Sequence, residues 1–229
     1  MEKFFIDIFI YGIPLIFAVV LHEVAHGWVA YKRGDPTAYS LGRLSLNPIK
    51  HVDLWGTIIF PAVELIFTGH VFFGWAKPVP VNYRLFKDPR RDITLVAAAG
   101  PLMNFSQAVT YAVIVKLLIY IFPTIVLYHN RPDLLVLAPL TIKIFLPIME
   151  MAIVGVLINL FLGLFNLIPI PPLDGSKVLM GIAPDPVYDF MKKIEPYGFT
   201  ILILIIFLVP GLISGLINPI INFVFSILF

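Results

Sequence analysis

The sequence contains no cysteine, few charged residues and no internal repeat or low-complexity tract. The lack of cysteine excludes disulfides and a cysteine-ligated metal site. Only 13% of the residues are charged, against about 25% in ordinary globular domains, while 59% are hydrophobic and the mean hydropathy is +0.95. These values exclude an ordinary soluble domain, and the net charge of +2 gives no reason to expect a nucleic-acid partner. We expect a single integral-membrane domain over residues 1–229.

Apolar segments dominate the chain, and several reach the length of about 20 helical residues that crosses a bilayer. They predict an all-α polytopic membrane protein with about five or six spanning or re-entrant segments. The first helix is expected from about Phe4 to Tyr31, and because its apolar run continues into a polar motif we expect it not to be a cleaved signal. The other apolar segments are Leu54–Phe73, Ile93–Phe122, Ile144–Ile168 and Gly198–Phe229, the last being one kinked span or a hairpin.

The segments between these helices carry different signals. Thr37–Asp53 alternates polar and apolar residues, which predicts short strands or a surface hairpin. Gly74–Asn82 contains two prolines and is expected to be extended, since each proline biases the residue before it away from helix. Pro123–Lys143 is expected to be a mixed loop, and Ser176–Tyr197 is polar.

Positive charges are distributed unevenly along the chain. Cytoplasmic loops of membrane proteins are rich in lysine and arginine. A re-entrant Leu54–Phe73 keeps both of its basic flanks in the cytoplasm, whereas a full span places one of them outside, so we favour the re-entrant form. The nine basic residues of these flanks are Lys32, Arg33, Arg43, Lys50, Lys77, Arg84, Lys87, Arg90 and Arg91.

A polar motif, His22-Glu23-Val24-Ala25-His26, lies in the second half of the first apolar helix. Two histidines four residues apart share one face of a helix and can bind the same metal ion. Glu23 beside them is placed to exchange a proton with a water that the metal activates. The motif lies near the Lys32 end of the helix, which the charge distribution assigns to the cytoplasmic side.

A catalytic zinc site has three protein ligands and one open position. The apolar helix expected over Ile144–Ile168 runs toward the same side of the membrane and is followed by Asp174. We expect Asp174 at a depth similar to that of His22 and His26. Prolines just before Asp174 forbid a regular helix there. We therefore expect Asp174 in a turn that lets its short side chain reach the metal as the third ligand.

Three motifs together resemble the site-2 protease family of intramembrane zinc metalloproteases. They are HEVAH from His22, GPLMN from Gly100 and NLIPIPPLDG from Asn166. The segments GRLSLNP and GWAKPVPVN are similar to segments of its compact prokaryotic subgroup, which lacks a PDZ domain. The resemblance implies one Zn²⁺ per chain held by His22, His26 and Asp174, with Glu23 as general base and acid. It also implies a substrate or oxyanion contact for Asn166 and, less directly, for Asn104; an interhelical hydrogen bond is the alternative role of each amide.

The function implied by this resemblance is hydrolysis of peptide bonds within or near transmembrane segments of membrane-anchored proteins, that is, regulated intramembrane proteolysis. The partners are then transmembrane protein substrates and the lipid bilayer, in the inner or plasma membrane of a prokaryotic cell. We further hypothesise that Trp75–Asn82 forms a small strand-like segment near the active site that pairs with an unwound substrate. No oligomeric state is predicted.

Two other functions were weighed against proteolysis. A transporter would require several intramembrane acids and repeat symmetry, whereas Glu64 is the main such acid and no repeat is present. A catalytically inactive scaffold is disfavoured because Glu23 and all three candidate ligands are present.

Overall fold

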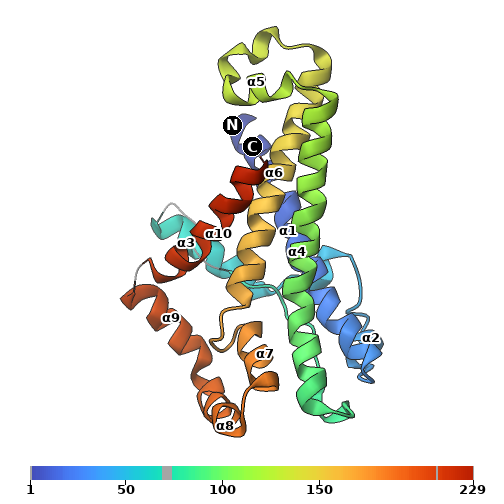
Figure 1. Ribbon diagram of the computed structural model, residues 1–229, viewed down its shortest axis with the longest axis vertical. Coiled ribbons are helices and arrows are strands. Elements are labelled where there is room, and N and C mark those ends of the chain that lie inside the picture. Colours follow the sequence, from blue (N-terminus) through green and yellow to red (C-terminus); the bar gives the residue numbers. More distant parts are fainter. Residues whose placement is uncertain (1, 69–73, 210, 229) are drawn as a thin grey trace. The chain divides into compact units, whose positions relative to one another are not determined.

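The computed structural model describes residues 2–68, 74–209 and 211–228, and within these ranges every regular element is helical (Figure 1). Three long helices form its framework: α1 (Glu2–Lys32), α4 (Pro89–Ile121) and α6 (Leu140–Asn166). All three are long and apolar enough to cross a membrane, α1 over Ile8–Lys32. The expected helices at the same places are thus confirmed, as is the all-α class of the described residues.

Shorter helices connect and follow these three. The α-helices are α2 (Thr37–Ser40), α3 (Phe60–Thr68), α5 (Ile125–Asn130), α7 (Asp174–Ile182), α8 (Asp185–Ile194), α9 (Gly198–Leu208) and α10 (Leu212–Leu228). The 3₁₀ turns are Pro48–His51, Tyr83–Leu85, Pro132–Leu137 and Glu195–Tyr197, and Leu54–Ile59 is a π-helix that leads into α3. The apolar C-terminal region is therefore two helices joined near Gly211, which has a φ of +88°.

The expectation of strands over Thr37–Asp53 was wrong. The stretch folds as the single turn α2, a left-handed glycine at Gly42 (φ +63°) and a 3₁₀ turn capped by Asn47. Local hydrogen bonds, such as Arg43 N–H to Ala38 O at 2.9 Å, satisfy the backbone here. The alternating pattern arises from exposed apolar side chains and not from the inner face of a sheet.

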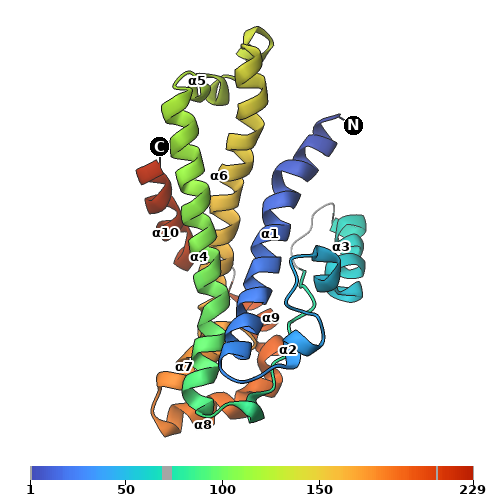
Figure 2. The same ribbon diagram turned by 90° about the vertical axis from the view of Figure 1, so that its right-hand side faces the viewer.

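The chain divides into two compact units, and the first comprises Met1–Ala18, Pro101–Asn166 and Phe199–Phe229. In it α6 lies beside the C-terminal part of α4 in both views (Figures 1 and 2), with Val115 and Met149 in the core between them. A buried amide pair joins the same helices: Asn104 Nδ2 donates to Asn159 Oδ1 at 2.9 Å. Large apolar side chains such as Tyr120 remain exposed on the outer faces, as expected where a helix contacts lipid.

The second unit comprises Val19–Gly100 and Leu167–Gly198. It contains the second half of α1, the start of α4, the connecting segments, α7 and α8. An ion pair with a buried carboxylate joins the residue after α1 to the start of α4, with Arg33 Nε donating to Asp92 Oδ1 at 2.6 Å.

The start of the apolar segment Leu54–Phe73 and the residues that follow the segment lie together in this second unit. Trp75 N–H donates to Gly56 O at 3.0 Å, and Lys77 N–H donates to His51 O at 2.9 Å. The segment Leu54–Phe73 is described as far as Thr68, and its last five residues, 69–73, lie outside the described ranges.

Candidate active site

Helix α1 brings the two histidines of the motif together. Their Nε2 atoms lie 3.0 Å apart, and the rings meet edge to face with centroids separated by 4.6 Å. Both side chains are buried, with 8% of each residue exposed. The i, i+4 spacing on one helix accounts for this proximity without any tertiary contact.

The orientation of His26 is fixed from α4. Its Nδ1 lies 2.7 Å from the backbone oxygen of Val96, and since a carbonyl only accepts, Nδ1 carries the proton and donates. The lone pair of Nε2 is then directed away from Val96 and toward His22. Such a hydrogen bond to the far nitrogen is the usual way in which a metal-binding histidine is held in its tautomer.

Asp174 completes the cluster from α7. Its Oδ2 lies 3.2 Å from Nε2 of His22 and 3.2 Å from Nε2 of His26. The same oxygen is buried and accepts no hydrogen bond of good geometry within the described part of the chain. Burial by itself would raise the pKa of Asp174, but the two neighbouring histidines outweigh it and hold the pKa below the usual range.

The local structure around Asp174 differs from the expected turn. Asp174 is the first residue of α7, and Leu173 before it is extended (φ −67°, ψ 153°). A new helix begins directly after the proline-containing segment. An acidic side chain in the first turn of a helix interacts favourably with the helix dipole. The side chain reaches the histidines from the start of this new helix.

The three atoms have the spacing that zinc requires. Four ligands at about 2.0–2.1 Å in a tetrahedron lie about 3.3 Å from one another. The observed separations of 3.0, 3.2 and 3.2 Å are close to one triangular face of that tetrahedron. Two imidazole nitrogens and a carboxylate oxygen are also ligands that zinc accepts. The residues present therefore fit a zinc ion with one position left open.

Gly100 on α4 leaves room for this cluster. A Cβ built on it would lie 2.6 Å from Nε2 of His22 and would collide with Nε2 of His26. Gly100 therefore packs directly against the pair of histidines.

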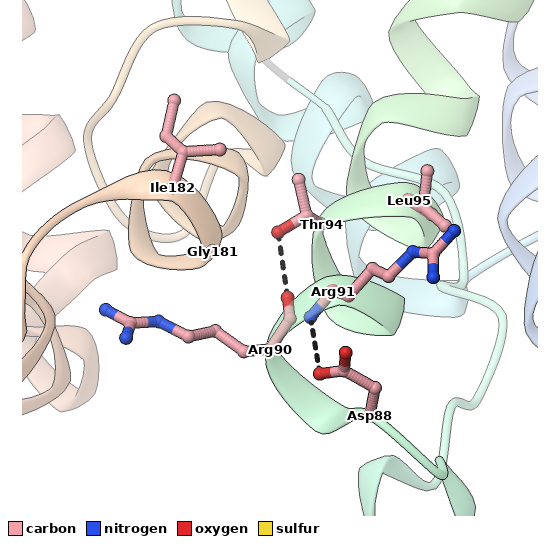
Figure 3. A pocket seen from close by; sticks show the side chains of 7 residues that line it. All are labelled: Asp88, Arg90, Arg91, Thr94, Leu95, Gly181 and Ile182. Atoms are coloured by element: carbon pink, nitrogen blue, oxygen red, sulfur yellow. Dashed lines mark hydrogen bonds between the residues drawn. The ribbon is translucent and has the colours of Figure 1, made fainter.

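Helix α7 is attached to the start of α4 at its other end. The Arg90 guanidinium donates to the backbone oxygen of Ala183, just past α7, and pairs with Asp185 at 2.9 Å. Gly181 lets α7 approach Thr94 closely, because a Cβ there would collide with the threonine hydroxyl. Figure 3 shows Arg90, Thr94 and Gly181 at a pocket of about 340 Å³, which is also lined by Asp88, Arg91, Leu95 and Ile182. These contacts fix the helix that carries Asp174.

Glu23, the glutamate between the two histidines of the motif, also has a defined contact. Its Oε2 accepts the N–H of Val79 at 2.8 Å, which places the segment Gly74–Asn82 beside the metal cluster. That segment is neither helical nor part of a β-ladder.

The two asparagines do not join the cluster. Asn104 is fully buried, and its Nδ2 donates to Ala18 O and to Asn159. Asn166 is the last residue of α6, and its Nδ2 donates to Leu162 O of the same helix at 2.9 Å. The described residues yield one group of possible metal ligands, namely His22, His26 and Asp174, and Glu64 is not in it.

Three contributors to this site were missed from the sequence: the Val96 carbonyl, the Val79 N–H and the space left by Gly100. The first two are backbone groups, which carry no side-chain signal. Gly100 belongs to the GPLMN motif, but nothing in that motif names the histidines as the residues it packs against.

Comparison with known proteins agrees with this site. The sequence profile of Peptidase family M50 matches residues 10–209. A protein of Bacillus subtilis (strain 168) named "Putative zinc metalloprotease YwhC" is 39% identical over 194 residues, which cover 84% of this chain and 78% of that protein. No solved structure gives a significant match. With a match over most of its length and a cluster that fits zinc, this chain belongs to peptidase family M50 and is a zinc metalloprotease.

Proposed function

We propose that this enzyme hydrolyses peptide bonds within or near transmembrane segments of membrane-anchored proteins, as a single membrane domain with its active site toward the cytoplasm. The observation that carries the proposal is the position of the ligand pair: His22 and His26 lie inside α1, one of the three helices able to span a membrane. A metalloprotease acting only on soluble proteins has no need to place its metal on such a helix.

In the proposed reaction His22, His26 and Asp174 would hold the zinc ion. Bound zinc would supply the Lewis acidity that activates a water and polarises the scissile carbonyl. The Glu23 carboxylate accepts the proton of that water and delivers it to the nitrogen of the leaving amine. The Val79 N–H occupies one carboxylate oxygen of Glu23, which leaves the other for proton transfer.

The substrate has to unwind before it is cut, because carbonyls inside a helix already accept N–H groups of their own chain. In Gly74–Asn82 the backbone groups of Trp75 and Lys77 are occupied by the protein itself: the N–H groups bond to Gly56 O and His51 O, and the oxygens accept from Thr57 and Arg43. In an extended chain, residues 76, 78 and 80 face the opposite edge. Prolines at 78 and 80 make that edge mainly an acceptor of hydrogen bonds. We propose that the unwound substrate donates its N–H groups to this row.

The re-entrant form of Leu54–Phe73 forms part of the proposal. A helix that spans a bilayer separates its ends by about 30 Å. The hydrogen bonds from Trp75 to Gly56 and from Lys77 to His51 instead keep the residues after the segment beside its start, which supports a segment that returns to the side from which it started.

The test is Glu23→Gln in reconstituted liposomes with a model transmembrane substrate. Glutamine keeps the size of the side chain but does not accept the proton, so cleavage should fall by roughly 10²–10⁴-fold while zinc remains bound. Cleavage near the wild-type rate would refute the role of Glu23. Cleavage of an unfolded soluble protein at the same rate as the membrane substrate would refute the proposed substrate class.

A further inference from the structure

Asp35 is a buried carboxylate that the proposed reaction does not use. It lies just past the end of α1 and has no exposed surface. Its Oδ1 accepts the N–H and the hydroxyl of Thr37, at 2.9 and 2.5 Å. Its Oδ2 accepts the N–H of Asn82 at 2.6 Å. A buried charge is tolerated where its acceptors are filled in this way, so Asp35 is firmly bonded to the segment that contains Asn82.

The segment held by Asp35 is the one that contacts the general base. Val79, three residues before Asn82, donates its N–H to Glu23 Oε2 at 2.8 Å. The Val79 side chain is buried against α1 at Gly27, where an added Cβ would lie 2.8 Å from Val79 Cγ1. Pro80 between the two anchors restricts the backbone that joins them. The place of the Val79 N–H therefore depends on the attachment at Asn82.

We propose that Asp35 is a positioning residue for catalysis: by holding the Asn82 amide it fixes the Val79 N–H, which in turn orients the Glu23 carboxylate. A glutamate side chain has several rotatable bonds, and a hydrogen bond to one oxygen selects the rotamer in which the other oxygen serves the reaction. This inference rests on the proposed role of Glu23 and adds Asp35 as the residue that orients the Glu23 carboxylate.

The first variant is Asp35→Asn. The amide keeps the size of the carboxylate but replaces one acceptor oxygen with a donor that faces other donors. We expect kcat to fall roughly tenfold or more, on the scale of a misplaced catalytic group, with KM and zinc content unchanged. Hydrogen–deuterium exchange of the Val79 and Asn82 amides should become faster, which is a readout independent of activity.

Asp92→Asn is the matched control. Asp92 is equally buried and lies near the same end of α1, but its partners are Arg33 and the Asp88 N–H and not the segment Gly74–Asn82. Its replacement should lower the melting temperature while leaving kcat per folded molecule and amide exchange at Val79 unchanged. An equal fall of kcat in both variants would reduce the effect of Asp35 to general stability and overturn the inference.

The decisive measurement is a double-mutant cycle with Val79→Pro, which removes the N–H that meets Glu23. If Asp35 acts through that N–H, Asp35→Asn should cause little further loss of kcat in the Val79→Pro background. Multiplicative losses, or a wild-type kcat in either single variant, would overturn the inference. Should Asp35→Asn fail to fold, Val79→Pro alone still tests the step from the Val79 N–H to Glu23, because a wild-type kcat at unchanged zinc content would overturn the inference. An active Glu23→Gln enzyme would instead refute the proposed function, so the two failures are distinguishable.

Discussion

Gly100 lies so close to His22 that a Cβ on the glycine would stand 2.6 Å from Nε2 of the imidazole ring. We therefore expect Gly100→Ala to displace the histidines and weaken zinc binding by roughly tenfold or more, the scale seen when the contacts that orient metal ligands are disturbed. Competition with a zinc chelator measures the change. Gly12→Ala is the control, because no atom lies within 4 Å of a Cβ placed there. Equal zinc affinity in both variants would contradict the role of Gly100.

The ligand set predicts the metal content of three further variants. His22→Ala, His26→Ala and Asp174→Ala should each lose most bound zinc and all measurable turnover, because each removes one corner of the triangle of 3.0 and 3.2 Å sides. Metal analysis of the purified protein gives the stoichiometry. If Asp174→Ala kept full zinc and full turnover, the third ligand would have to be another acid.

The re-entrant topology can be tested by cysteine labelling, which the lack of native cysteine makes free of background. Single cysteines at Leu46 and Arg84, on either side of Leu54–Phe73, should both react with an impermeant thiol reagent from the cytoplasmic side only. Both residues are exposed. A cysteine at Val136, between α5 and α6, should react from the opposite side. Labelling of positions 46 and 84 from different sides would establish a full span.

Substrate choice should follow the stability of the substrate helix. Relative to alanine, glycine weakens a helix by about 1 kcal/mol and proline by about 3 kcal/mol on soluble-helix scales. A model substrate should therefore be cut faster as one position near the scissile bond is changed from Leu to Gly or Asn. Cleavage rates in liposomes across this series provide the measurement. Equal rates throughout would mean that unwinding does not limit the reaction and that access to the site determines selectivity.

The framework and the ligands of this site were predictable because their signals are local. A long apolar run defines each spanning helix, and the four-residue spacing of His22 and His26 alone places them on one face of α1. Asp174 was predicted as the third ligand, and the structure brings it to the two histidines, although as the first residue of α7 and not as a turn residue. An acid after a proline-rich stretch is also a helix-start signal, and that signal was overlooked.

The remainder depends on tertiary contacts that a single sequence does not specify. The hydrogen bond from the Val79 N–H to the Glu23 side chain joins residues 56 positions apart. A backbone N–H is present in every residue except proline, so no residue type predicts this bond. The strands expected over Thr37–Asp53 failed for a related reason: an alternating pattern predicts a strand only if a partner strand exists, and the described residues contain none.

The two prolines of Gly74–Asn82 also bear on how molecules of this enzyme meet in the plane of the membrane. An extended segment with an unpaired edge is normally a site of aggregation, because its backbone N–H and C=O groups can form hydrogen bonds with the same groups of a second copy. In the row proposed to receive the substrate, the acceptors are the carbonyls of Ala76, Pro78 and Pro80, and the N–H of Ala76 is the single donor. Two such rows present oxygen to oxygen and repel each other. If the row binds a substrate as proposed, the prolines that suit it to a chain with its own N–H groups also keep two copies of the enzyme from pairing through it.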